Sequence, residues 1–139
     1  MHPIFNTFRP DGFGTVNAYI FASNPEALIK FYKDAFYAEE LDRTMNAQTG
    51  DIANCILRIG TNCVMVSQAR GQFVGMRSAF YLYVDDVDQV HKNALDHGGK
   101  LVFNPSDMEY YDRQSGITDP AGNYWWISMR LHEANYWEQ

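Results

Sequence analysis

The side chains best suited to chemistry in this sequence do not gather into a recognisable catalytic set. The four histidines are His2, His91, His97 and His132. His91 falls on an otherwise apolar helical stripe and has no second metal ligand at position i+4. Cys55 and Cys63 lie among apolar residues without a basic neighbour, which predicts buried free thiols rather than a disulfide or a nucleophile.

Residues 110–113 combine aromatic and charged side chains, so they are the next candidates. The Arg113 guanidinium could hold an anionic group through two parallel hydrogen bonds, or form an ion pair with Asp112 or Glu109. Tyr110 adds an aromatic hydroxyl to the same segment. We expect residues 110–113 to form a loop that leads into the last hairpin.

The composition narrows the range of partners. The chain has 139 residues and a net charge of −6, from 11 lysines and arginines against 17 aspartates and glutamates. Neither nucleic acid nor an anionic membrane surface is therefore an expected partner. The longest apolar run, residues 79–84, is far shorter than the roughly 18 residues of a membrane span, and residues 1–9 resemble no secretory signal. We expect one domain over residues 1–139, located in the cytoplasm.

The elements that must position these residues occur twice. A shift of 62 positions aligns residues 18–24 with 80–86, and residues 59–65 with 121–127. Each half has a helix start signal, Asn24-Pro25 in the first and Asp86 in the second, followed by apolar residues at helical spacing. The predicted helices are 25–36 and 87–97, and the predicted later strands are 40–45, 52–59, 62–67, 100–103, 115–119 and 123–129.

This order predicts an α+β fold of two βαβββ modules in one chain. Module one spans about residues 12–68 and module two about residues 79–131, and residues 68–78 link them. Each module would form a four-stranded mixed sheet with a single helix, which covers only one face of the sheet. The uncovered faces of the paired sheets therefore predict a cup-shaped trough that is open to a ligand.

Several motifs carry a resemblance to a known family. They are Asn17-Ala18-Tyr19-Ile20-Phe21, Phe31-Tyr32-Lys33-Asp34-Ala35-Phe36, Leu57-Arg58-Ile59-Gly60, Tyr81-Leu82-Tyr83-Val84-Asp85-Asp86 and Asp119-Pro120-Ala121-Gly122. In this order they resemble the vicinal oxygen chelate superfamily of glyoxalases, bleomycin-resistance proteins and extradiol dioxygenases, and most of all its PhnB-like branch. The resemblance covers residues 9–131 and implies paired modules whose inner faces form a cup that often holds a divalent metal.

The resemblance also implies where the metal ligands would lie. The four places are the start of the first strand and the middle of the last strand of each module, and they hold Asn17, Val64, Ala79 and Trp126. These residues offer one weak oxygen ligand, whereas a catalytic divalent metal needs about three good ones. The places where the PhnB-like branch carries histidines hold Asn54 and Asn123. We therefore expect no metal and no cofactor.

Strand alternation predicts which residues line the trough. If Asn17 and Ala79 face inward, the same parity turns inward Tyr19, Phe21, Asn54, Ile56, Arg58, Asn62, Val64, Tyr81, Tyr83, Tyr124, Trp126 and Ser128. The expected ligand-binding residues are Asn17, Tyr19, Asn54, Arg58, Tyr81, Tyr83, Tyr110, Arg113, Tyr124 and Trp126. The same aromatic residues would also serve as core if a partner subunit closed the inner face.

Two functions remain open at this point. The first is a metal-free protein that binds a flat or amphipathic small molecule in the trough. The alternative is a lyase, isomerase or dioxygenase whose metal is held by atypical ligands such as Asn17, Glu109 or Asp112. A trough that serves only dimerisation is a further possibility. We expect a homodimer, because the exposed sheet edges and an aromatic content of 15% favour association and the resembling proteins usually pair.

Overall fold

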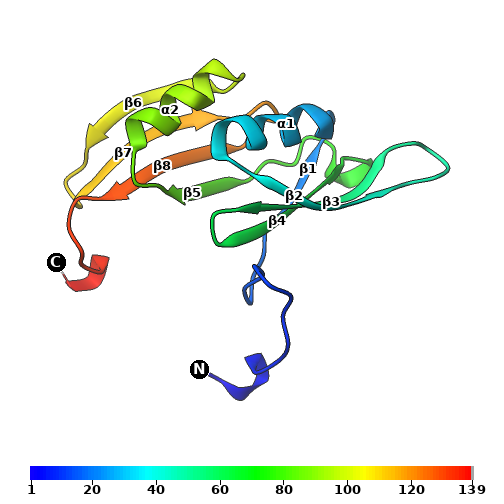
Figure 1. Cartoon of the computed structure of the whole chain (residues 1–139), viewed down its shortest axis with the longest axis horizontal. Helices are drawn as coiled ribbons and strands as arrows, with labels where there is room; N and C mark the ends of the chain where they lie inside the picture. Colours follow the sequence, from blue (N-terminus) through cyan, green and yellow to red (C-terminus); the bar gives the residue numbers. More distant parts are fainter. Residues whose placement is uncertain (139) are drawn as a thin grey trace.

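The fold consists of two copies of one strand-helix-three-strand unit. The computed structural model describes residues 1–138 (Figure 1). Module one comprises β1 (Tyr19–Ala22), α1 (Pro25–Phe36), β2 (Glu39–Met45), β3 (Ile52–Ile59) and β4 (Asn62–Gln68). Module two comprises β5 (Ala79–Tyr83), α2 (Val87–Asp96), β6 (Lys100–Asp107), β7 (Asp112–Thr118) and β8 (Tyr124–Arg130). Short 3-10 helices lie outside the modules at Pro3–Phe5, Gly71–Phe73 and Tyr136–Glu138.

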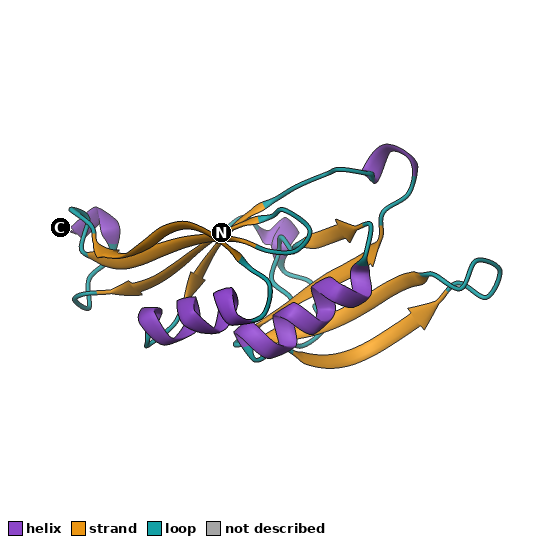
Figure 2. Ribbon diagram, turned by 90° about the horizontal axis from the view of Figure 1, so that it is seen from above, coloured by secondary structure: helices purple, strands orange, loops and turns teal. Residues whose placement is uncertain are grey.

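Each module forms its own four-stranded sheet. Sheet one has the strand order β1-β4-β3-β2 and sheet two the order β5-β8-β7-β6. β1 runs parallel to β4 and β5 runs parallel to β8, while the other neighbouring strands are antiparallel. Both helices lie on the same side of the two sheets (Figure 2). The predicted α+β fold of two βαβββ modules with mixed sheets is confirmed.

The helices begin where their capping residues predict. Asn24 Oδ1 accepts a hydrogen bond from the Ala27 N–H, and Asp86 Oδ1 accepts one from the Gln89 N–H. α1 has the predicted bounds, whereas α2 ends at Asp96, one residue earlier than predicted, because the backbone turns at His97 and Gly98 follows at a φ of +109°. Neither α-helix within residues 1–138 is long and apolar enough to cross a membrane.

Strand boundaries in module two differ from the prediction. β6 continues past residue 103 to Asp107, and β7 begins at Asp112 rather than at residue 115. Two irregularities in the pairing let β6 continue far enough for Asp107 to pair with Arg113. The predicted loop at residues 110–113 is therefore wrong for Asp112 and Arg113, which are strand residues.

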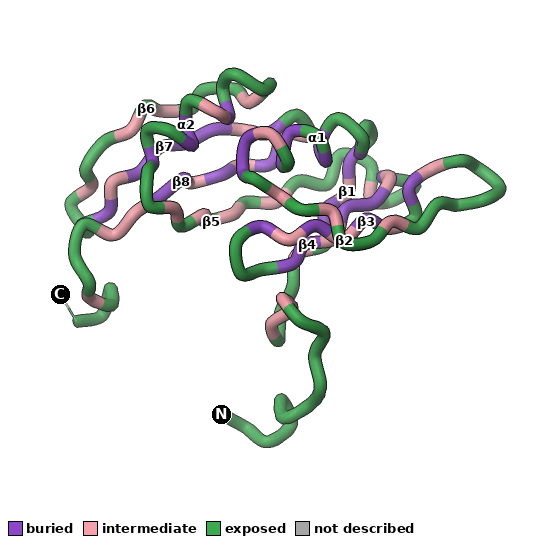
Figure 3. The backbone as a smooth tube through the Cα atoms, in the orientation of Figure 1, coloured by how far each residue is buried: buried purple, intermediate pink, exposed green. Residues whose placement is uncertain are grey.

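The hydrophobic core lies between the helices and the sheets, and it is continuous across both modules. Tyr32 and Phe36 of α1 pack on Trp125 of β8, with ring centroids 5.4 and 4.8 Å apart. Buried segments follow the strands and helices, whereas both chain ends are exposed (Figure 3). Because a helix of module one packs on a strand of module two, the two modules share one core.

A buried carboxylate joins the turn between β7 and β8 to α1. Asp119 is 3% exposed and accepts hydrogen bonds from the Asn123 N–H at 3.0 Å and the Trp125 indole N–H at 2.9 Å. A further donor comes from module one, since Tyr32 Oη lies 2.6 Å from Asp119 Oδ2. Burial, and then the nearby Asp119 charge, raise the pKa of Tyr32 well above its ordinary value. The hydroxyl therefore keeps the proton that it donates.

We expect Tyr32→Phe to lower the free energy of unfolding by about 1.5–3 kcal/mol, because it removes a hydrogen bond to a buried charged group. Urea titration at pH 7 measures the change. Tyr37→Phe is the matched control, since it removes an exposed hydroxyl that accepts a hydrogen bond from Asn93, and its effect should be smaller. Equal losses in the two variants would contradict a special role for the Tyr32–Asp119 bond.

Candidate functional site

The candidate site is formed by the sheet faces that point away from the helices, called the inner faces. Along β1 and β3 the residues that alternate with the buried core positions lie on this side, and in sheet two the same holds for β5 and β8. The inner face of sheet one carries Tyr19, Phe21, Asn54, Ile56, Arg58, Met65 and Ser67. The inner face of sheet two carries Tyr81, Tyr83, Tyr124, Trp126 and Ser128.

A tyrosine, a serine and a side-chain amide meet on the inner face of sheet one. Ser67 Oγ lies 2.9 Å from Tyr19 Oη, and Asn54 Nδ2 lies 3.3 Å from the same hydroxyl. Asn54 Nδ2 also approaches Met65 Sδ at 3.4 Å. We call Tyr19, Asn54 and Ser67 the first polar triad.

The same arrangement recurs on sheet two. Gln114 Nε2 donates to Ser128 Oγ at 2.9 Å and also to Tyr81 Oη. In both sheets the tyrosine comes from the first strand of the module, the amide from the third strand and the serine from the last. We call Tyr81, Gln114 and Ser128 the second polar triad. The internal repeat therefore extends from the backbone to the chemistry of the inner faces.

The second polar triad is saturated by further hydrogen bonds. Tyr81 Oη donates to the fully buried Asp112 carboxylate at 2.6 Å, and Tyr110 Oη donates to Gln114 Oε1 at 2.7 Å. Burial, and then the hydrogen bond to Asp112, raise the pKa of Tyr81 to about 12. This hydroxyl is therefore a fixed donor rather than a group that titrates near neutrality.

Arg130, at the end of β8, and the C-terminal segment, residues 131–138, add further hydrogen bonds to this network. Tyr136 Oη donates to Asp112 Oδ2 at 2.7 Å and also contacts Tyr83 Oη. Arg130 Nη1 donates to Asp112 Oδ1 at 2.9 Å, and its guanidinium lies 4.3 Å from the centre of the Tyr136 ring. Burial favours a higher pKa for Asp112, but hydrogen bonds from Tyr81, Arg130 and Tyr136 hold the pKa of this carboxyl below its ordinary value.

The first polar triad remains more accessible. Its Asn54 is half-buried, whereas Gln114 of the second triad is 1% exposed, and within residues 1–138 the carbonyl oxygen of Asn54 accepts no hydrogen bond. Arg58 is half-buried on the same face, and its guanidinium makes no hydrogen bond or ion pair within the described chain. Sheet one therefore offers an acceptor, a positive charge and an aromatic ring to a ligand.

The N-terminal arm, residues 1–17, lies on the inner side of sheet one. An open hollow of about 560 Å³ lies between the arm and the sheet, and its lining includes Phe5, Phe13, Ile56 and Met65. The arm is held by backbone contact, because the Gly12 carbonyl accepts a hydrogen bond from the Cys63 N–H at 2.7 Å. A Cβ at Gly12 would lie 2.5 Å from Cys63 Sγ, and the φ of +85° also favours glycine.

Asn17, an expected ligand-binding residue, anchors this arm. Its side-chain oxygen accepts a hydrogen bond from the Gly14 N–H, and its side-chain nitrogen donates to the Gly14 carbonyl, both at 2.8 Å. Both ends of the amide are therefore in use. The structure thus gives Asn17 a structural partner that the sequence did not indicate.

Asn62 and Val64 do not face inward as predicted. Val64 belongs to the hydrophobic core and pairs with Leu57, and Asn62, two residues away on the same strand, shares its side. The error comes from a change of register between the modules. Tyr19 pairs with Met65, whereas its counterpart Tyr81 pairs with Trp126, so the offset between the last strands is 126 − 65 = 61 rather than 62. Met65 is the true counterpart of Trp126.

Arg113 also lies on the other side of its sheet. Its guanidinium forms ion pairs with Asp88 of α2 and with Asp107 of β6, each at 2.9 Å. It therefore pairs with neither Asp112 nor Glu109, and it points toward the helix rather than into the trough. The placement follows from alternation once β7 begins at Asp112, because Asp112 and Gln114 then share the inner face.

The residues present do not fit a divalent metal. With the register corrected, the four positions hold Asn17, Met65, Ala79 and Trp126, which lack the carboxylate and imidazole groups of a catalytic site. Asn123 is buried and bonded to Asp119 and to the Ser78 N–H. Within residues 1–138 no three His, Cys, Asp or Glu side chains gather as a metal site. Of the atypical ligands, Asn17 is bonded to Gly14, and Asp112 accepts hydrogen bonds from Tyr81, Arg130 and Tyr136.

The two modules and their tyrosine-bearing inner faces define a paired βαβββ protein. The family model of the Glyoxalase/Bleomycin resistance protein/Dioxygenase superfamily matches residues 12–127. The chain therefore belongs to this superfamily, as the motifs predicted. Its assignment to the PhnB-like branch stays a prediction. No curated protein matches the chain.

Several solved structures share the fold of this chain. TioX from Micromonospora sp. ML1 is 21% identical with a TM-score of 0.68, and the match covers 84% of this chain and 99% of that chain. A glyoxalase/bleomycin resistance protein/dioxygenase family enzyme from Burkholderia phytofirmans PsJN is 20% identical with a TM-score of 0.66, over 83% and 97% of the two chains. Glyoxalase I from Zea mays is 19% identical with a TM-score of 0.68, over 84% of this chain and 44% of that chain. At these identities the likeness concerns the fold.

We expect Asp112→Asn to lower the free energy of unfolding by about 3 kcal/mol at pH 7, because it removes the charge that Arg130 faces in a buried network. The folded-state pKa of Asp112 lies below the unfolded value. Its contribution is therefore complete above about pH 4 and is lost as the pH falls through the folded-state pKa. Denaturation of both proteins between pH 7 and 2 should show their difference shrinking below pH 4.

The control for this series is Asp96→Asn, which removes an exposed carboxylate paired with Lys92 one helical turn away. Its effect at pH 7 should be much smaller than that of Asp112→Asn. A difference between wild type and Asp112→Asn that stayed constant down to pH 2 would contradict the proposed charge network.

Proposed function

We propose that this protein binds a small, flat or amphipathic organic molecule on its inner faces, without a metal or cofactor. The observation that carries the proposal is the combination of exposed aromatic rings and free polar groups on one face. Tyr19, Tyr81 and Tyr83 are 43%, 43% and 54% exposed, and Asn54 and Arg58 have groups without partners within residues 1–138. Apolar surface with a few placed polar groups is typical of ligand sites.

Two features support a location over sheet one. The hollow beneath the N-terminal arm is lined by aromatic and aliphatic side chains and lies against Ile56 and Met65. Arg58, two residues from Ile56 on the same face, would meet an anionic or strongly polar group of the ligand. Tyr124 and Trp126, whose ring centroids lie 4.2 Å apart, extend the aromatic surface on sheet two.

A thermal-shift screen against planar aromatic compounds tests the proposal, because a ligand at 100 times its Kd stabilises the folded state by about 2.7 kcal/mol. For a compound found in this way, we expect Tyr19→Ala or Trp126→Ala to weaken binding about tenfold. Trp126 is only half-buried. Trp126→Ala should therefore lower the free energy of unfolding by less than the about 3–5 kcal/mol expected for a fully buried ring.

Trp137→Ala is the control, since this ring is 81% exposed in the C-terminal segment, and it should bind the compound like the wild type. Dialysis against a chelator should leave the affinity unchanged. Binding that disappears after dialysis and returns with zinc, nickel or manganese would overturn the metal-free proposal and favour a metal-dependent lyase, isomerase or dioxygenase.

We also propose a homodimer. The N-terminal arm projects from the body on the side opposite the helices (Figure 1), and its Ile4 and Phe8 are 73% and 88% exposed. The edge strand β6 adds Leu101 and Val102, which are 51% and 46% exposed. Exposed apolar side chains and an unpaired strand edge are typical of protein interfaces.

Sedimentation at micromolar concentration should give a species of about twice the 16.0 kDa chain mass. Phe8→Ser should shift this species toward the monomer, because it removes exposed apolar surface from the arm. Thr7→Ser, beside it, serves as the control. A single species near 16.0 kDa for the wild type would contradict the homodimer.

We place the protein in the cytoplasm as part of the same proposal. Cys55 and Cys63 are both buried free thiols, and reducing compartments keep cysteines in this form. Cell fractionation with an antibody to the chain would test the location.

A further inference from the structure

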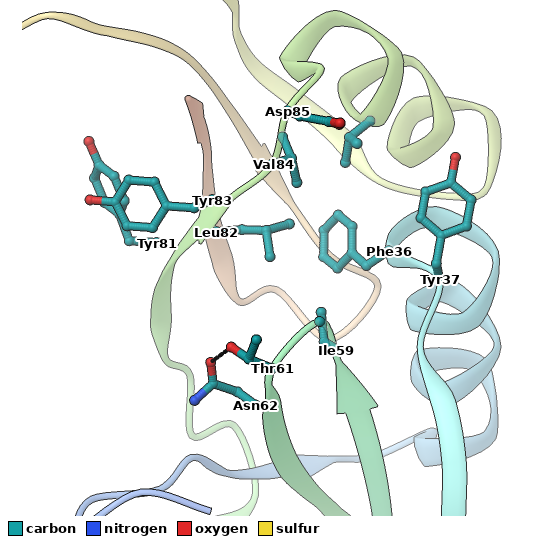
Figure 4. A pocket seen from close by; sticks show the side chains of 12 residues that line it. Phe36, Tyr37, Ile59, Thr61, Asn62, Tyr81, Leu82, Tyr83, Val84 and Asp85 are labelled. Atoms are coloured by element: carbon teal, nitrogen blue, oxygen red, sulfur yellow. Dashed lines mark hydrogen bonds between the residues drawn. The ribbon is translucent and has the colours of Figure 1, made fainter. Parts of the chain in front are cut away.

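A cavity lies away from the inner faces, where the two modules meet. It has a volume of about 540 Å³ and opens between the β3–β4 turn and β5, above the end of α1 and the start of α2. Leu82, Val84, Phe36 and Ile59 point toward one another across it, whereas the Tyr81 and Tyr83 rings turn away toward the inner face (Figure 4). The floor of this junction cavity is therefore apolar and separate from the trough.

The rim of the junction cavity carries one charge, that of Asp85. No lysine, arginine or histidine is among the residues that line the cavity, and within residues 1–138 the exposed Asp85 carboxylate makes no hydrogen bond or ion pair. The neighbouring carboxylates are already engaged, since Asp86 caps α2 and Asp88 pairs with Arg113. The Asp85 carboxylate thus has no hydrogen-bond donor within the described chain, and it lies beside the apolar floor of the junction cavity.

Each helix end at the cavity is offset by side chains of opposite charge, since Lys33 lies in the last turn of α1 and Asp86 and Asp88 lie at the start of α2. The attraction for a cation therefore comes from Asp85 and from the net charge of −6.

We propose that the junction cavity binds a small cationic amphiphile, that is, a protonated amine attached to an aromatic or branched aliphatic group. The apolar group would rest on Leu82, Val84 and Phe36, and the ammonium group would meet the Asp85 carboxylate. This site is independent of the one proposed for the inner faces, because its side chains come from the opposite face of β5.

The test uses 2-phenylethylamine as the probe and 2-phenylethanol as its neutral analogue, followed by the chemical shifts of backbone amides in NMR titrations. We expect the amine to bind with a Kd of about 1 mM, typical of so small a ligand, and to shift the amides of residues 82–85. Asp85→Asn should weaken amine binding about two- to fivefold, the effect of a single exposed ion pair, and should leave binding of the alcohol unchanged. High salt should weaken binding of the amine alone.

Two further variants separate the cavity from general charge effects. Asp42→Asn removes another exposed carboxylate, on β2 outside the cavity, and should bind the amine like the wild type. Thr61→Trp places a large ring at the exposed rim without changing a core residue, and should block both probes. Equal binding of amine and alcohol, unchanged binding in Asp85→Asn, or shifts confined to the inner faces would overturn the proposal. The proposal would also be wrong if a second copy of the chain filled the cavity. In that case Thr61→Trp would prevent the two copies from associating and would sediment as a monomer.

Discussion

Each four-stranded sheet in this protein has only one helix, so one face of each sheet has no helix to cover it, and the rest of the structure depends on this constraint. A helix can cover only one face, so the apolar residues collect on that side and form the shared core. The other face must be stable in contact with water or a ligand, and the chain solves this with tyrosines whose hydroxyls are hydrogen-bonded. Aromatic rings supply contact area while the hydroxyls satisfy polar partners. The polar triads, the N-terminal arm and the C-terminal segment all lie on this side.

The fold could be predicted because its signals are local. Asn24 and Asp86 cap the helices as their positions indicate, and the repeated order of elements specified two modules. It was harder to predict on which face of its sheet a single side chain lies, because that depends on how the strands pair. A one-residue change of register between the modules moved Val64 into the core and Met65 to the inner face, and an earlier start of β7 turned Arg113 toward α2.

The second polar triad was missed for a related reason. Gln114 comes from a strand whose start was placed too late, although Tyr81 and Ser128 were both predicted to face inward. The repeat did not reveal it, because the members of the two triads are 62, 60 and 61 positions apart (81 − 19, 114 − 54 and 128 − 67), so no single shift of the sequence aligns them. The two triads have also diverged: the second is saturated by Asp112, Tyr110 and the C-terminal segment, while the first keeps free groups. The inner face of sheet two is thus held by a closed hydrogen-bond network, whereas the inner face of sheet one keeps polar groups without partners within residues 1–138.

The bond between Tyr32 and Asp119 joins residues that are 87 positions apart in the chain. During synthesis on the ribosome, α1 and sheet one are complete long before the turn at residue 119 emerges. Until then Tyr32 and Phe36 lack the Trp125 ring on which they pack, so a nascent chain exposes an aromatic surface for most of its translation. The shared core is therefore complete only when the last hairpin is present, and a chain that stops before it would expose Tyr32 and Phe36 to chaperones and proteases.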